Sequence, residues 1–155
     1  MRGPDARFFN SSDSPAFIPT FTPAPMTPLT GAALDSLRGI VASDLGGRRA
    51  SVLSDASLWG RAFSLCWAAR SALIVTGFFI RSASAPETDG PPGSVILGRA
   101  LAFLGKRVSL ATDRHNLSAL DACSGSVGGP SVLCLDGPDP AVLEGFDLLV
   151  FLERP

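Results

Sequence analysis

The sequence predicts an α/β, Rossmann-like three-layer domain with a mainly parallel sheet. Two observations lead to this prediction. From residue 72 onward, short β-prone apolar runs alternate with helical segments, and hydrophobic residues make up 46% of the 155-residue chain, enough for one core. Strand–helix–strand units in this order form parallel sheets through right-handed crossovers. We expect the sheet to be incomplete at its C-terminus, because the chain ends at Pro155, directly after the last predicted strand.

The first 30 residues differ in composition from the rest of the chain. Prolines recur throughout residues 15–28, and proline both lacks an amide donor and interrupts regular helix. We therefore expect an extended or disordered arm over residues 1–30 and the α/β domain over residues 31–155.

Two helices are expected before the first strand. In residues 33–45, apolar side chains recur three or four positions apart, which predicts an amphipathic helix that ends near Gly46. Residues 55–70 predict a second helix. Asp55 is its expected N-cap, because a carboxylate at that position accepts hydrogen bonds from the first free amides.

The sheet is expected between residues 72 and 153. The run ALIVTGFFI is continuous and β-prone, which is typical of a strand buried on both faces. The segment SVILGRALAFL is so apolar that we expect a largely buried helix. The expected strands are 72–80, 107–112, 131–136 and 147–153, and the expected helices are 94–104, 116–123 and 140–145.

Charge and cysteine usage exclude several classes of function. A formal net charge of −1 gives no electrostatic reason to expect nucleic-acid or membrane partners. No apolar run reaches the roughly 18 residues that a membrane span needs. Three cysteines without a CxxC pair, together with the single His115, argue against a zinc site or a disulfide framework, so we expect no metal.

The carboxyl ends of the predicted strands indicate where a ligand would bind. In open parallel sheets, ligands bind beyond these ends. Polar residues that follow each strand should therefore meet at one edge. The residues expected there are Thr76, Gly77, Glu87, Thr88, Asp89, Thr112, Asp113, Arg114, Asp136, Glu153 and Arg154.

The loop PETDGPPG is long for a strand-to-helix connection. We expect its helix to begin near Pro92 or Gly93, with the amides of Gly93, Ser94 and Val95 free to bind an anion. There is no GxGxxG, and the GxxxxG spacing from Gly93 lacks the Lys-Ser/Thr of a phosphate loop.

The acidic residues at this edge each have a structural alternative. Asp89 either caps the helix or faces the ligand, where it would bind an ammonium or move a proton. Glu87 is either a functional group or a solvated loop carboxylate. Glu153 and Arg154 are either site residues or a surface pair.

Four segments carry a family resemblance: LIVTGF (73–78), PETDGPPG (86–93), GRALAFLGKRVSLATD (98–113) and FDLLVFLERP (146–155). Together they resemble the carboxy-terminal domain of D-glutamate cyclase over residues 31–155. Members of that family continue beyond the equivalent of ERP, so the resemblance implies a C-terminally truncated domain.

The resemblance implies a lyase of D-amino acid metabolism that cyclises D-glutamate to 5-oxo-D-proline and water, without a cofactor. Its implied partner is a small acidic amino acid, and the implied location is intracellular: the mitochondrial matrix in a eukaryote and the cytoplasm otherwise. The alternatives are a non-catalytic Rossmann-like module that binds small ligands and an inactive fragment. Nothing in the sequence indicates an oligomeric state.

Site residues follow from placing this chemistry on the predicted edge. The catalytic candidates are Asp89, Glu87 and Glu153. The substrate-binding candidates are Thr76, Gly77, Thr88, Gly93, Ser94, Asp113, Arg114 and Arg154.

Overall fold

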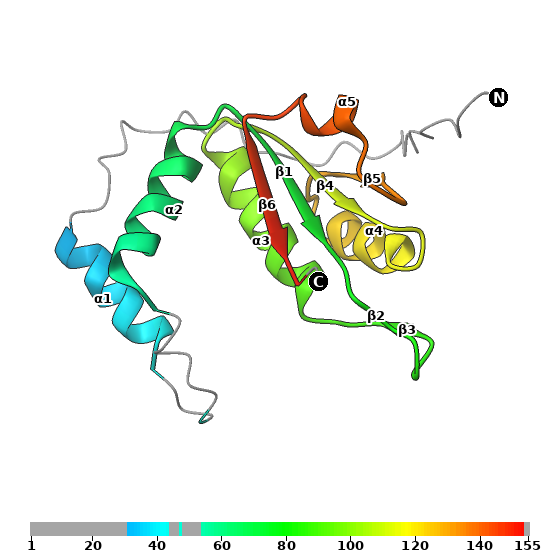
Figure 1. Ribbon diagram of the computed structural model, residues 1–155, viewed down its shortest axis with the longest axis horizontal. Helices are drawn as coiled ribbons and strands as arrows, with labels where there is room; N and C mark the ends of the chain where they lie inside the picture. Colours follow the sequence, from blue (N-terminus) through cyan, green and yellow to red (C-terminus); the bar gives the residue numbers. More distant parts are fainter. Residues whose placement is uncertain (1–30, 44–46, 48–53, 154–155) are drawn as a thin grey trace. The chain divides into compact units, whose positions relative to one another are not determined.

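The computed structural model describes residues 31–43, 47 and 54–153 (Figure 1). These residues fall into two compact units, one with two helices and one that begins at Arg70 and contains the sheet. The arm expected over residues 1–30 lies outside the described residues, as does Gly46. Within the described part of the chain, no helix has the length and apolar character needed to cross a membrane.

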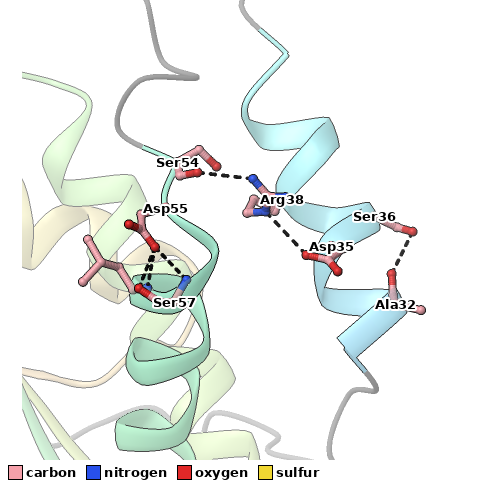
Figure 2. A network of polar contacts seen from close by, with 8 residues as sticks. Ala32, Asp35, Ser36, Arg38, Ser54, Asp55 and Ser57 are labelled. Carbon is pink, nitrogen blue, oxygen red and sulfur yellow. Dashed lines mark hydrogen bonds and ion pairs between the residues drawn. The ribbon is translucent and has the colours of Figure 1, made fainter.

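The helical unit consists of α1 (Gly31–Val41) and α2 (Ala56–Ala68). Figure 2 shows how the side chain of Arg38 on α1 bridges two acceptors. Its Nη1 donates to the carbonyl oxygen of Ser54 at 3.3 Å, and its Nε lies 3.6 Å from Oδ1 of Asp35. Arg38 therefore links α1 to the residue that leads into α2.

Asp55 caps α2, as the sequence predicts. Its Oδ1 accepts hydrogen bonds from the hydroxyl of Ser57 at 2.6 Å and from the amide of Ser57 at 2.7 Å (Figure 2). These bonds lower the pKa of Asp55 from its ordinary value because they stabilise the charged form, and the bond from the Ser57 hydroxyl has the largest effect.

The second unit is built on a four-stranded parallel sheet, which confirms the predicted α/β fold. Its strands are β1 (Ser71–Thr76), β4 (Arg107–Thr112), β5 (Ser131–Cys134) and β6 (Leu148–Leu152), in the spatial order β5-β4-β1-β6. The bounds of β4 equal those predicted. Since β1 lies between two strands, its residues Leu73 and Ile74 are fully buried.

Helices α3 (Gly90–Phe103) and α4 (Leu117–Ser126) pack against each other and against the sheet (Figure 1). The close approach of α3 to the sheet needs Gly98, because a β-carbon there would lie 2.9 Å from Cγ of Pro130. A shorter helix, α5 (Pro140–Leu143), precedes β6. The expected helical turn at 140–145 is therefore present but shorter.

Several predicted boundaries differ from the observed ones, and two of these differences affect the carboxyl edge of the sheet. The strand expected over 72–80 ends at Thr76, because Gly77 has a φ of +114°, a conformation that breaks the extended chain. The remaining residues form a separate antiparallel pair, β2 (Phe79–Ile80) with β3 (Ala85–Pro86). The helix expected to begin near Pro92 or Gly93 begins at Gly90.

The side chain of Asp147 ties the beginning of β6 to the beginning of β1. Its Oδ2 accepts hydrogen bonds from the amides of Arg70 at 3.0 Å and Ser71 at 3.1 Å. In return, the amide of Asp147 donates to Oγ of Ser71 at 3.0 Å. The bond from the Arg70 amide is the main reason that the pKa of Asp147 is lowered.

We expect Asp147→Asn to lower the melting temperature at pH 7. Because the folded-state pKa of Asp147 is lowered, its carboxylate stabilises the fold above its ordinary pKa of about 3.9, and this contribution is lost as the pH falls through the folded-state value. The gap between variant and parent should therefore close in acid. Thermal unfolding followed by circular dichroism between pH 7 and pH 3 measures it, with the exposed Asp121→Asn on α4 as the control. An equal gap at both pH values would contradict this role.

Candidate active site at the carboxyl edge of the sheet

The sheet places the carboxyl ends of its four strands side by side. Thr76, the last residue of β1, is in register with Leu152 of β6, and Thr112, the last residue of β4, is in register with Cys134 of β5. Glu153 follows Leu152 directly. The carboxyl edge therefore collects polar residues from β1, β4 and β6, as the strand order predicts.

Three carboxylates meet at this edge. One oxygen from each of Glu87, Asp89 and Glu153 lies within 4.8 Å of the others, and we call these residues the acidic cluster. Glu87 is half-buried, while Asp89 and Glu153 are exposed. The amide of Glu87 donates to the carbonyl oxygen of Phe78 at 2.8 Å, which fixes the loop against the residues that follow β1. The structure thus brings the three catalytic candidates together.

The beginning of α3 determines what Asp89 can do. Asp89 is the N-cap, and a capping carboxylate ordinarily accepts from the amides of the second or third helical residue. Those residues are Pro91 and Pro92, which have no amide hydrogen. Among the described residues, its Oδ1 accepts only from the adjacent Gly90 amide, at 3.1 Å. Asp89 is therefore a cap and a member of the acidic cluster at once.

The expected anion site at the start of α3 is absent in the described structure. The amide of Gly93 donates to the carbonyl oxygen of Asp89 at 3.4 Å, and the buried hydroxyl of Ser94 donates to that of Pro91 at 2.8 Å. Because α3 begins at Gly90, Ser94 and Val95 lie beyond its first turn. The prediction that the Gly93 amide is free is wrong. Thr88 is exposed in the same loop.

Arg114 forms an ion pair with another acid at the edge. Its Nη2 lies 2.9 Å from Oδ2 of Asp136, and its amide donates to Oδ1 at 3.1 Å. This pairing lowers the pKa of Asp136 and raises that of Arg114. The Asp113 carboxylate accepts from the amides of His115 and Asn116 at the entry to α4. Arg154 lies outside the described residues.

Buried polar atoms without partners mark the same edge. Within the described residues, these include Oγ1 of Thr76, Oγ1 of Thr112 and Oδ1 of Asn116, all at most 1% exposed. Gly77 packs against two of them, since a β-carbon there would contact Oγ1 of Thr112 and lie 2.9 Å from Cγ of Asn116. The sequence pattern predicts Asn116 only as the start of a helix. Its one signal in the sequence is a position just beyond a strand that ends at the carboxyl edge.

These features define a Rossmann-like α/β domain with an acidic, polar site at the carboxyl edge of its parallel sheet. The chain belongs to the family of D-glutamate cyclase-like, C-terminal domains, whose family model matches residues 37–155. The matched range contains the whole sheet and the acidic cluster, and it confirms the resemblance on which the sequence prediction rests. No curated protein sequence matches the chain.

We expect Gly77→Ala to destabilise the domain by about 1–3 kcal/mol, because the new methyl group combines an unfavourable positive φ with overlap against Thr112 and Asn116. Urea unfolding gives the change in free energy. The matched control is Gly125→Ala in α4, where a β-carbon meets nothing within 4 Å. Equal stability of Gly77→Ala and the parent would contradict close packing of Gly77 against Thr112 and Asn116.

Proposed function

We propose that this chain is a D-glutamate cyclase-like lyase that converts D-glutamate to 5-oxo-D-proline and water. The observation that carries the proposal is the acidic cluster, which lies at the ligand-binding edge of the sheet and inside the range matched by the family. The proposal places the chain in D-amino acid metabolism.

The reaction is an intramolecular condensation. The amine nitrogen attacks the carbon of the γ-carboxyl group and forms the amide bond of a five-membered ring. One γ-carboxyl oxygen leaves as water, with the two protons that the ammonium group loses, so atoms and charge balance. The enzyme must hold the substrate in its folded-back conformation and move these protons.

The acidic cluster suits both tasks. Carboxylates form charge-assisted hydrogen bonds with an ammonium group, which would orient the amine. Asp89 is the preferred proton acceptor, because prolines deny it the usual capping bonds and the adjacent Gly90 amide occupies only Oδ1. A group that receives a proton from the nitrogen can pass it to the departing oxygen.

We expect Asp89→Asn to reduce turnover of D-glutamate by more than about tenfold, because the amide cannot accept the proton. Glu87→Gln and Glu153→Gln should weaken substrate binding, seen as a higher KM. Chiral chromatography of 5-oxo-D-proline measures turnover. Asp121→Asn, which changes an exposed acid on α4 outside the cluster, is the matched control and should keep parental activity.

The absence of 5-oxo-D-proline from a preparation that unfolds cooperatively would overturn the proposed function. Unchanged turnover in Asp89→Asn would instead overturn the catalytic role of Asp89 and leave this residue as a cap alone. Stabilisation by nucleotides but not by glutamate in a thermal-shift screen would favour the alternative of a non-catalytic binding module.

A further inference from the structure

The geometry of the acidic cluster matches the size of one metal coordination sphere. Hard divalent cations bind oxygen ligands at about 2.0–2.6 Å, so two ligands on opposite sides of one ion lie about 4–5 Å apart. The three carboxylate oxygens of Glu87, Asp89 and Glu153 lie within 4.8 Å of one another. A single ion can therefore reach all three after small side-chain movements.

Thr76 provides an independent observation at the same place. Its side chain is fully buried, and Oγ1 has no hydrogen-bond partner in the structure. A β-carbon on Gly90 would lie 2.7 Å from this oxygen and 3.1 Å from Cβ of Glu153, so both side chains cover the same side of Gly90. Gly90 follows Asp89 directly. The unpaired hydroxyl therefore lies beside Gly90, on the side of this residue that Glu153 also covers.

No cation of the described residues forms an ion pair with the acidic cluster. The ion pairs of the described residues lie elsewhere and join Arg38 to Asp35, Arg70 to Asp147 and Arg114 to Asp136. Three neighbouring negative charges repel one another, and a cation bound between them removes this repulsion. The cluster also lacks histidine and cysteine, so its donors are oxygen atoms, which Mg²⁺, Mn²⁺ and Ca²⁺ prefer.

We propose that Glu87, Asp89 and Glu153, together with the hydroxyl of Thr76, bind one hard divalent cation. Each carboxylate contributes one oxygen. The exposure of Asp89 and Glu153 leaves the ion open to water and to a further ligand. The spacing of cysteine and histidine in the sequence predicts no metal, but this criterion does not apply to an all-oxygen site.

The role of this cation in substrate binding rests on the proposed function. D-Glutamate carries two carboxylates, which three protein carboxylates would repel. Arg114 is already paired with Asp136, and the Gly93 amide is already bonded. A cation in the acidic cluster would bind a substrate carboxylate and stabilise the negative charge that develops on its oxygen. The second oxygen of a ligating carboxylate remains able to accept the proton.

Titration of the metal-free full chain with Mn²⁺ tests the site directly. Electron paramagnetic resonance detects the free ion, and we expect one saturable ion per chain, displaced by excess Mg²⁺ or Ca²⁺. Asp89→Asn and Glu153→Gln should each weaken Mn²⁺ binding by about tenfold or more. The control Asp121→Asn should bind as the parent does.

Thr76 is tested by a pair of substitutions. Thr76→Val removes the hydroxyl while keeping the shape, and it should weaken Mn²⁺ binding several-fold. Thr76→Ser keeps the hydroxyl and should retain parental affinity. Parental Mn²⁺ affinity in Thr76→Val would mean that the hydroxyl does not ligate, which overturns the assignment of Thr76.

The proposed function and the cation site fail in different ways. Mn²⁺ binding that the cluster variants weaken, without turnover of D-glutamate, supports the cation site and overturns the function. Turnover in excess chelator, without saturable Mn²⁺ binding, supports the function and overturns the cation site. Mn²⁺ binding that Asp89→Asn and Glu153→Gln leave unchanged comes from an adventitious ion only and also overturns the site.

Discussion

The pairing of β6 with β1 is the contact on which the candidate site depends. These strands stand at opposite ends of the sheet-forming segment in the sequence, yet they are neighbours in the sheet, in register from Ala72 with Leu148 to Thr76 with Leu152. Asp147 fixes the beginning of this pair through the amides of Arg70 and Ser71. The far end of the same pair brings Glu153 beside Thr76. Without this pairing, the acidic cluster would consist of two loop residues.

Much of the fold could be predicted because the local pattern of each segment and the order of the segments along the chain both indicate a parallel sheet. The alternation of apolar runs with helices is enough to predict a parallel sheet, and the strand predicted over 107–112 is observed with the same bounds as β4. The extent of the first strand could not be predicted. Apolar residues continue through Phe79 and Ile80, and only the positive φ of Gly77 ends β1 early. That angle is a property of the folded chain, because glycine adopts either sign of φ.

The candidate site also has features that the sequence predicts and features that it does not. Glu87, Asp89 and Glu153 could be placed at one edge from the direction of the strands alone. The sequence also shows Pro91 and Pro92 after Asp89. Because these prolines have no amide hydrogen, they cannot donate the usual capping bonds to Asp89. By contrast, the unpaired oxygens of Thr112 and Asn116 depend on burial by distant segments, which no local pattern reports. The sequence also does not predict the ion pair between Arg114 and Asp136.

A ligand in the acidic cluster would be coupled to the architecture of the sheet. Its protein contacts come from the loop before α3 and from the residue that follows β6, two segments that only the folded sheet brings together. An ammonium group or a divalent cation bound there interacts with all three carboxylates in the native state and with scattered ones in the unfolded chain. Binding therefore stabilises the native state by mass action. Repulsion among the three carboxylates of the acidic cluster acts in the opposite direction and destabilises the unliganded native state. The same arrangement keeps these carboxylates available for a cationic group.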